Sequence, residues 1–174
     1  MTLRSGTAAL LLSVAGLLSC GYHVGGKADL LPKGIQTIAI PAFTTATMRY
    51  RLVDLLPQQI GREFVQRTRF RITTDPSEAD AILYGSINSA TVGAVAFDPA
   101  SGKSTSLAIT VGLSVRLVER STGRVLFSRP NIGFHQNYEV AVDPHQFFDE
   151  SGPALDRLSH DVARDLVSAI TENF

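Results

Sequence analysis

One stretch of the chain decides which fold we expect: Leu107-Ala108-Ile109-Thr110-Val111-Gly112-Leu113-Ser114-Val115-Arg116-Leu117-Val118. Aliphatic residues occupy every second position from 107 to 117, and mostly small or polar residues lie between them. Successive side chains of a β-strand point to opposite faces of the sheet, so this pattern predicts a long strand with one buried face. Such a strand is typical of an antiparallel sheet that is covered on one side only.

Shorter β-branched or alternating segments predict further strands before and after this stretch. They cover residues 35–40, 70–72, 81–87 with a weaker continuation toward residue 92, 125–127, and 132–140. Asp75-Pro76-Ser77 and Ser121-Thr122-Gly123 predict turns, and Pro130 is expected to separate the last two strands. The segment from Gly93 to Ser106 is expected to be a loop.

Two segments predict amphipathic helices, because their apolar residues recur at spacings of three and four. These residues are Val53, Leu56, Ile60 and Phe64 in segment 49–67, and Leu155, Leu158, Val162, Leu166 and Ile170 in segment 153–170. Pro57 is expected to kink the first helix, or to lie in its first turn if Asp54 is the N-cap. Ser151 and Pro153 fit the N-cap and the first turn of the second helix.

The order of these elements is strand, helix, several strands and helix, which predicts an α+β fold. We expect a mainly antiparallel β-sheet with two α-helices packed on one face. The chain has 174 residues, enough for one such domain with its own core.

The charge and the cysteine content exclude two kinds of partner. The 16 Lys and Arg residues balance the 16 Asp and Glu residues, so the chain has no broad positive field to hold nucleic acid. The single cysteine, Cys20, forms neither an internal disulfide nor a multi-cysteine zinc site. The four histidines have no short metal-binding spacing: His23, His135, His145 and His160. We therefore expect neither nucleic acid nor a metal ion.

The start of the chain is typical of an exported protein. Arg4 is followed by an apolar run over residues 8–18, too short to cross a bilayer but suited to a secretory signal. No later segment is as long and free of charge, so we expect no membrane-spanning helix after it. We expect a signal peptide over residues 1–19, a tether over residues 20–34 and one domain over residues 35–174.

The sequence around the cysteine, Leu17-Leu18-Ser19-Cys20-Gly21, resembles the lipobox of bacterial lipoproteins. The resemblance implies cleavage before Cys20 and lipid on its sulfur and its new amino group. Two or more acyl chains anchor a protein stably without spanning the membrane. Gly21 stands where an Asp would resemble an inner-membrane retention signal, so outer-membrane sorting is favoured. The alternative is that Cys20 is a chance thiol at the end of an exported leader.

Residues that often carry catalysis do not form a catalytic set in this sequence. Gly102-Lys103-Ser104-Thr105 lacks the earlier glycine of a phosphate-binding loop, where the chain has Phe97, and predicts a polar hairpin loop instead. Ser159-His160-Asp161 are neighbours on a predicted helix, where side chains point about 100° apart and form no relay.

Acidic residues gather around the last strand and the loop after it: Glu139, Asp143, Asp149 and Glu150. Two of them could pair as acid and base, but no neighbouring group in the sequence is placed to raise the pKa of one. We therefore expect no enzyme activity, and no cofactor apart from the covalent lipid on Cys20.

Several blocks of the sequence occur together in one known family. They are Cys20-Gly21-Tyr22-His23, Thr37-Ile38-Ala39-Ile40-Pro41-Ala42-Phe43, Ala79-Asp80-Ala81-Ile82-Leu83-Tyr84-Gly85, and Ser121-Thr122-Gly123-Arg124-Val125-Leu126-Phe127 followed by Tyr138-Glu139. In this order they resemble the LPS-assembly lipoprotein family, LptE. The resemblance implies an LptE-like α+β domain in an outer-membrane lipoprotein that plugs and helps assemble the LptD β-barrel, which delivers lipopolysaccharide (LPS) to the cell surface.

The resemblance also implies contact with LPS through basic residues near the loop and the sheet end. The candidates are Lys103, Arg116, Arg124 and Arg129. Such cations can pair with lipid phosphates, Arg in bidentate fashion and Lys as a point charge. The alternative is that they are ordinary solubilising charges. No basic cluster follows Tyr138, in contrast to the best-known enterobacterial members.

Two other functions stay open at this point. One is a periplasm-facing lipoprotein scaffold that binds another envelope protein. The other is a periplasmic hydrolase, which would depend on Asp143, Glu150 or His135.

Overall fold

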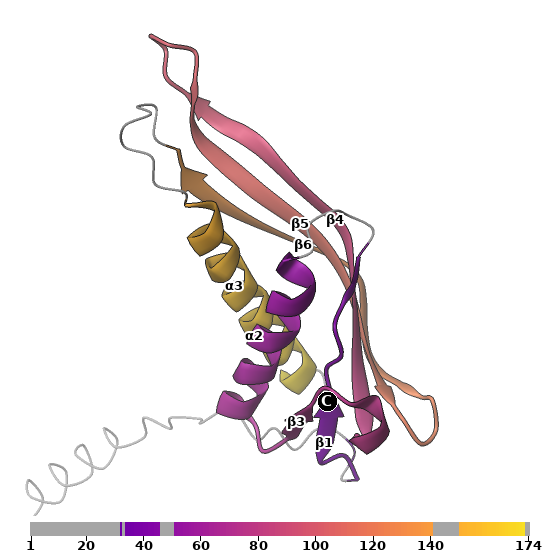
Figure 1. Cartoon of the computed structure of the whole chain (residues 1–174). Helices are drawn as coiled ribbons and strands as arrows, with labels where there is room; N and C mark the ends of the chain where they lie inside the picture. The colour runs from indigo at the N-terminus through magenta and orange to yellow at the C-terminus, as the bar shows by residue number, and fades with distance from the viewer. Residues whose placement is uncertain (1–31, 33, 46–50, 141–149, 173–174) are drawn as a thin grey trace, which may run out of the picture.

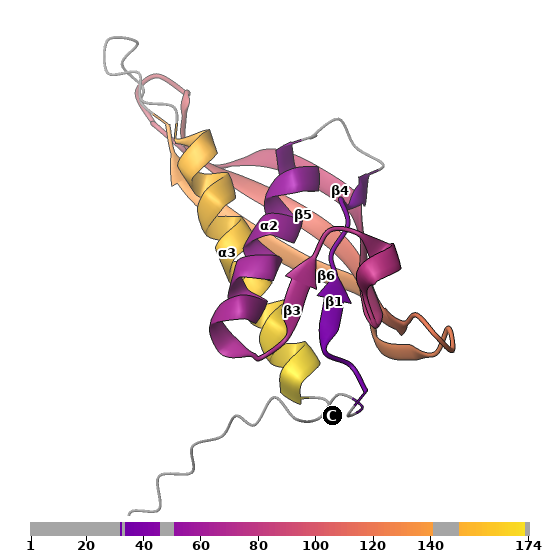
Figure 2. The ribbon, with the colours of Figure 1, turned by 60° about the horizontal axis from the view of Figure 1, so that its bottom comes forward.

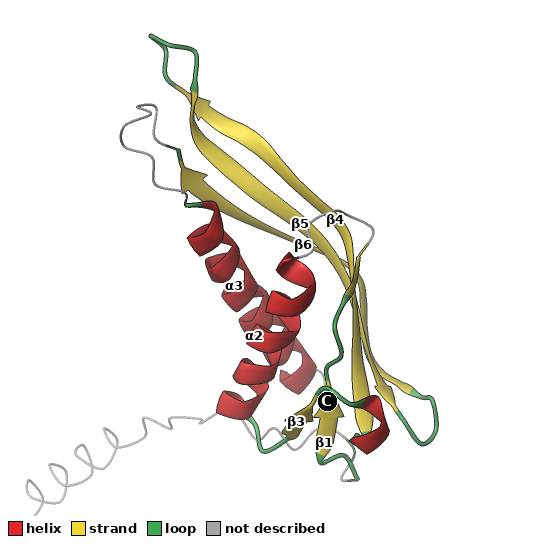
Figure 3. Ribbon diagram, in the orientation of Figure 1, coloured by secondary structure: helices red, strands yellow, loops and turns green. Residues whose placement is uncertain are grey.

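The structure is a computed structural model that describes residues 32, 34–45, 51–140 and 150–172 (Figure 1). Its elements in chain order are β1 (Thr37–Ala39), β2 (Thr44–Thr45), α2 (Arg51–Arg67), β3 (Arg71–Thr73), a 3₁₀ turn (Pro76–Glu78), β4 (Ala81–Phe97), β5 (Ser104–Glu119), β6 (Val125–Glu139) and α3 (Ser151–Glu172). The two helices lie side by side on one face of the sheet (Figures 1 and 3). The predicted α+β fold is confirmed.

The sheet has six strands in the order β3-β1-β4-β5-β6, with β2 also beside β4. The long strands β4, β5 and β6 are antiparallel to their neighbours, as expected. The short strands differ, because β1 runs parallel to β3 and β4, and β2 runs parallel to β4. Helix α2 connects β2 to β3, and a helical crossover returns the chain in the same direction. The sheet is therefore mixed.

The long strands extend further than the sequence pattern predicts. Strand β4 continues to Phe97 and β5 begins at Ser104, so the expected loop over 93–106 is wrong except for residues 98–103. The alternation in residues 88–97 is weak, but pairing with β5 places this segment in a strand. Tertiary pairing thus overrides local pattern here.

Pro130 does not separate two strands, because β6 runs continuously from Val125 to Glu139. Leu113 lies opposite Ile132 and Val115 lies opposite Arg129, so two residues of β6 face one residue of β5. This arrangement is a β-bulge. Proline is tolerated there because β6 is an edge strand, where one row of N–H groups needs no strand partner.

The core lies between the sheet and the two helices. All five predicted apolar residues of α3 are buried, and so are Leu56, Ile60 and Phe64 of α2, whereas Val53 is only half-buried. From β5 they meet the buried row Ile109, Val111, Leu113, Val115 and Leu117. Among the described residues, neither helix has the length and apolar character needed to span a bilayer.

Pro57 lies inside α2, and the helix does not end there. Asp54 lies in the first turn of α2, so its alternative role as N-cap is wrong. The helix continues through Pro57, which has no N–H to donate to the carbonyl oxygen of Val53. The N–H of Phe43 donates to that oxygen instead, at 3.3 Å. This bond ties the segment between β1 and β2 to the helix.

Helix α3 begins two residues earlier than expected. Ser151 is its first residue rather than its N-cap, and Pro153 lies in the first turn as predicted. The N–H of Ala154 donates to the carbonyl oxygen of Glu150 at 2.9 Å.

Asp80 joins the beginnings of two parallel strands. Its Oδ2 accepts hydrogen bonds from the backbone N–H groups of Gln36 and Thr37, each at 2.9 Å. These bonds lower the pKa of the Asp80 carboxyl group, and the nearby charges of Arg120 and Arg71 lower it further. The charged carboxylate thus holds the start of β1 against the start of β4.

We predict that Asp80→Asn lowers the free energy of unfolding by about 1–3 kcal/mol at pH 7, because two backbone donors lose their charged acceptor. The folded-state pKa of Asp80 is lowered, so its stabilising effect is present above the unfolded-state pKa of about 4 and is lost as the pH falls through the folded-state pKa. Urea unfolding at pH 7 and near pH 3 would measure this.

Asp75→Asn is the matched control. Asp75 also has a lowered pKa, but its side chain bonds only to Ser77 within one turn. We expect a smaller loss of stability from this variant. An equal loss for Asp80→Asn at both pH values would contradict the charge-based explanation.

Candidate functional site

The sheet face that turns away from the helices carries a pocket of about 390 Å³. It lies where β4, β5 and β6 are covered at one edge by the segment between β1 and β2. Its lining residues are Pro41, Ala42, Thr44, Tyr84, Gly85, Ser86, Ser114, Val115, Arg116, Ser128 and Pro130. The volume is within the range of sites that hold small ligands or parts of larger ones.

The segment that forms one wall of this pocket is held by Phe43. The Phe43 ring is buried against Gly85, where any added Cβ atom would overlap the ring. Glycine at this position therefore permits the close approach of the wall to β4. The hydroxyl group of Thr44 donates to the carbonyl oxygen of Gly85 at 3.3 Å and adds a second tie.

Arg116 and Tyr84 form the charged part of the pocket. They lie directly opposite each other on β5 and β4, and the guanidinium carbon is 5.1 Å from the centroid of the Tyr84 ring. A cation over an aromatic face is stabilised without losing its charge. The ion pairs among the described residues use Arg67, Arg124, Arg129, Arg157 and Arg164, and none uses Arg116. Arg116 is thus available to bind an anionic group.

Hydroxyl groups surround this cation. Ser114 donates to the carbonyl oxygen of Pro130 at 2.6 Å and accepts from the amide of Asn88 at 2.5 Å. Ser86 and Ser128 have no hydrogen bond from their hydroxyl groups to any described residue. A guanidinium with free hydroxyl groups beside it can bind an anion that carries further polar groups, such as a sugar phosphate.

Lys103 lies far from this pocket, in the exposed turn between β4 and β5. Asp98 organises the turn by accepting bonds from the hydroxyl group and the N–H of Ser101 and from the N–H of Ala100. These bonds lower the pKa of Asp98. Gly102 has a positive φ of 67°, which favours glycine. The predicted polar hairpin loop is confirmed for Gly102 and Lys103, whereas Ser104 and Thr105 already belong to β5, so a strand rather than a helix follows.

The other two basic candidates already have carboxylate partners. Arg124 lies 3.4 Å from Glu119 in the turn between β5 and β6. Arg129 points to the helix side of the sheet, where it lies 3.6 Å from Asp165 and over the ring of Phe127.

The structure therefore does not bring the four basic candidates together. Lys103 and Arg124 lie beyond opposite ends of the 16-residue strand β5, which spans about 50 Å at ~3.3 Å per residue. Arg116 and Arg129 lie on opposite faces of the sheet. The role of each in lipid contact stays a prediction.

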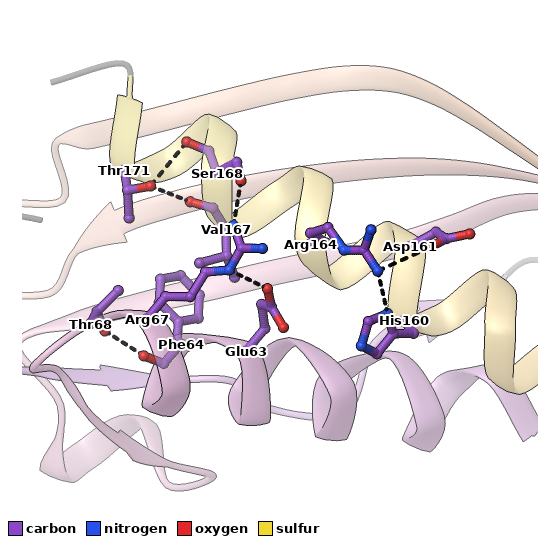
Figure 4. Close-up of polar contacts among 10 residues, drawn as sticks. All are labelled: Glu63, Phe64, Arg67, Thr68, His160, Asp161, Arg164, Val167, Ser168 and Thr171. Carbon is purple, nitrogen blue, oxygen red and sulfur yellow. Dashed lines mark hydrogen bonds and ion pairs between the residues drawn. The ribbon is translucent and has the colours of Figure 1, made fainter. Parts of the chain in front are cut away.

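The consecutive Ser159, His160 and Asp161 bond to other residues of α3 rather than to one another, and Figure 4 draws the contacts of His160 and Asp161. The hydroxyl group of the fully buried Ser159 donates to the carbonyl oxygen of Leu155 at 2.8 Å. The His160 ring lies 3.1 Å from Arg164, which also lies 3.8 Å from Asp161. These contacts are local to α3.

Figure 4 also shows a polar bridge between the two helices. Arg67 of α2 lies 2.5 Å from the buried Glu63 and donates to the hydroxyl group of Ser168 on α3 at 2.8 Å. Each charged group thus has a partner, and the bridge explains how a buried carboxylate is accommodated between helices.

The residues named for a hydrolase are not assembled into a described site. His135 is on β6 opposite Thr110, and Glu150 lies 3.8 Å from Arg157. Asp143 and Asp149 lie outside the described residues, and so do Cys20, His23 and His145. Within the described ranges no group of three or more His, Cys, Asp or Glu residues is placed to hold a metal ion.

Sequence reasoning identified Arg116 but missed Tyr84 and the surrounding hydroxyl groups. Alternation alone placed Arg116 on the outer face of the sheet. The partner of Arg116 depends on the register of β4, which a single strand's pattern does not specify.

Comparisons with known proteins agree with this architecture. The model of the family LptE, described as lipopolysaccharide-assembly, matches residues 35–170. A search of curated proteins found no match. Three solved structures share the fold at low sequence identity.

The first is lipoprotein B from Nitrosomonas europaea, with 17% identity, a TM-score of 0.56 and coverage of 87% of this chain and 93% of that one. The second is the rare lipoprotein B from Shewanella oneidensis, with 8% identity, a TM-score of 0.54 and coverage of 79% and 96%. The third is the PelC dodecamer from Paraburkholderia phytofirmans, with 13% identity, a TM-score of 0.50 and coverage of 78% and 88%.

Proposed function

The chain belongs to the lipopolysaccharide-assembly family LptE, and we propose that it is an outer-membrane lipoprotein that plugs and helps assemble a β-barrel of the LptD kind. In this role it serves in the transport of LPS and its insertion at the cell surface. The observation that carries the proposal is the family match over residues 35–170, which includes every strand and nearly all of both helices.

The outer face of the sheet supports a position inside a wide barrel. Its side chains are mostly small and polar, as the register indicates: Ser86, Ser89, Thr91, Thr110, Ser114, Ser128 and Asn137. The interior of a wide outer-membrane barrel is also polar. Such a face can lie against a polar lumen wall, and Arg116 is its one charged side chain in the pocket, stacked on Tyr84.

We propose that Cys20 carries the lipid and that Arg116 is the first of the basic candidates to meet an LPS phosphate. Arg116 has no carboxylate partner among the described residues, whereas Arg124 and Arg129 would have to exchange theirs for phosphate. Lys103 is exposed at the hairpin tip and offers a second, separate contact. This assignment needs no catalytic group, and we do not propose an enzyme.

A scaffold that binds another envelope protein is the alternative, and the fold alone does not separate the two. The PelC protein of Paraburkholderia phytofirmans shares the fold and forms a dodecamer. The partner must therefore be identified by experiment.

We predict that the tagged chain, purified from native outer membranes in mild detergent, recovers one large β-barrel protein in near-equal amount. An unrelated tagged outer-membrane lipoprotein serves as the control and should not recover it. Mass spectrometry of the purified complex would identify the barrel and the ratio. Recovery of only a homo-oligomer, or of a different envelope protein, would contradict the plug.

We predict that Cys20→Ser abolishes labelling by radioactive palmitate, because the sulfur that accepts the lipid is lost. Ser19→Ala is the matched control, since it keeps a small residue before the cysteine. Labelled protein is measured by autoradiography after immunoprecipitation. Persistence of the label on the Cys20→Ser variant would show that the anchor lies elsewhere.

We predict that Arg116→Ala weakens binding of purified LPS by about tenfold, the order expected for losing a charge-assisted hydrogen bond. Lys103→Glu should also weaken binding through charge repulsion. Binding to immobilised LPS is measured by biolayer interferometry. Arg124→Ala is the control and should bind as the natural chain does, because Arg124 is paired with Glu119. Natural affinity in the Arg116→Ala variant would remove the pocket from the LPS-binding surface.

A further inference from the structure

Among the described residues, one edge of β4 has no neighbouring strand over most of its length. Strand β1 pairs with Ala81 and Ile82, and β2 pairs with Ser86 and Ile87. From residue 88 to residue 97, the described part of the chain places a strand on the β5 side only. We name residues 88–97 the β4 edge. Figures 1 and 2 show that the β4–β5 hairpin projects beyond the ends of both helices.

The hydrogen-bonding direction of each residue in the β4 edge follows from the pairing of β5. The N–H of Val140 donates to the carbonyl oxygen of Thr105, so Thr105 directs its backbone groups toward β6. Backbone groups alternate in direction along a strand, so Ala108, Thr110 and Gly112 direct theirs toward β4.

These three residues lie opposite Gly93, Thr91 and Ser89, which therefore bond to β5. It follows that Ala90, Val92 and Ala94 direct their N–H and carbonyl groups away from β5, toward the side without a strand. The register is continuous from Ser89 to Ala94, so these backbone groups, which meet no strand in the described part of the chain, have the regular spacing that an added strand requires.

Apart from the register shifts at its two ends, the β4 edge lacks the features that usually protect exposed strand edges. Its sequence, Asn-Ser-Ala-Thr-Val-Gly-Ala-Val-Ala-Phe, contains neither a charged residue nor a proline. The other two edges of the sheet are protected, because β3 has only three residues and β6 contains Pro130 in its bulge. An unprotected edge of this length invites pairing with another chain.

Exposed apolar side chains continue this surface toward the tip. Val95 is 54% exposed and Phe97 is 59% exposed, although both types of residue are usually buried. They lie at the end of the regular register, where they can contact the side chains of an incoming strand.

We propose that the β4 edge binds an extended segment of another protein, which adds to the sheet as a strand. The segment carries large apolar side chains at alternate positions on its helix-facing side. This follows from the small residues Ala90 and Ala94 on that side of β4, because large side chains fill the space that small ones leave. A second copy of this chain would place small residues against small residues and would gain little contact.

The added segment is not a strand of a barrel wall. A closed barrel pairs every strand with two neighbours and has no free edge. The inference thus concerns a segment outside such a wall, and it does not depend on the proposed function.

The probe for this surface is a synthetic ten-residue peptide in which Phe and Val alternate with Thr, with Lys at each end for solubility. We expect hydrogen exchange of the Ala90, Val92 and Ala94 amides to slow at least tenfold when the peptide is added to the ¹⁵N-labelled mature chain. The amides of Thr91 and Gly93 already bond to β5 and should change little. This alternation distinguishes strand addition from general apolar binding.

Two controls test the main-chain bonds. The same peptide, N-methylated at every second amide, should give no protection. In the chain, Val92→Pro removes an outward N–H without removing a bond to β5, and it should abolish the protection of the amides by the peptide. Val92→Thr keeps that N–H, and the protection should remain. Circular dichroism verifies that both variants are folded.

The proposal is overturned if the three amides stay unprotected at millimolar peptide, or if the N-methylated peptide protects them equally. Concentration-dependent protection in the chain alone, together with a dimer in analytical ultracentrifugation, would instead identify a second copy as the occupant and overturn the assignment to another protein.

Discussion

The structure depends on the burial of one face of β5. Five aliphatic side chains from Ile109 to Leu117 are removed from water on that face, and each contributes on the order of 1.5–3 kcal/mol when fully buried. The sheet alone does not cover them, so α2 and α3 must lie on the same side. Strands β4 and β6 satisfy the backbone of β5 on its two edges, and the short parallel strands add to β4. The other face of β5 is left for polar contacts.

Two of the register shifts between the long strands are bulges near the pocket, where one extra residue reverses which positions face the helices. In β4 the extra residue is Asn88, so Leu83 and Ile87 face the helices before it and Ala90 and Val92 after it. In β6 the extra residue lies at Pro130 and Asn131. Ser114 lies between the two bulges and bonds to both, through the amide of Asn88 and the carbonyl oxygen of Pro130. This residue therefore connects the geometry of the sheet to the pocket beside it.

The surfaces with functional interest lie on the parts of the sheet that the helices leave uncovered. The pocket around Arg116 offers a cation and hydroxyl groups, and the β4 edge offers backbone groups that pair with no strand in the described ranges. One surface is suited to an anionic ligand and the other to an extended polypeptide. They lie at different places along β4, so a ligand and a protein segment could bind at the same time.

Local pattern determined the element types and the layers. The period of two in residues 107–117 and the spacing of three and four in α3 predict a half-buried strand and an amphipathic helix whatever surrounds them, because each depends only on where successive side chains point. The register and the ends of the long strands were decided by tertiary structure. The pattern continues only weakly toward residue 92 and does not predict a strand over residues 93–97, and nothing in Arg116 alone predicts Tyr84 as its partner. One inserted residue at a bulge changes which side chains lie opposite each other in the sheet. The register is therefore determined only when two strands pair and the core packs against them.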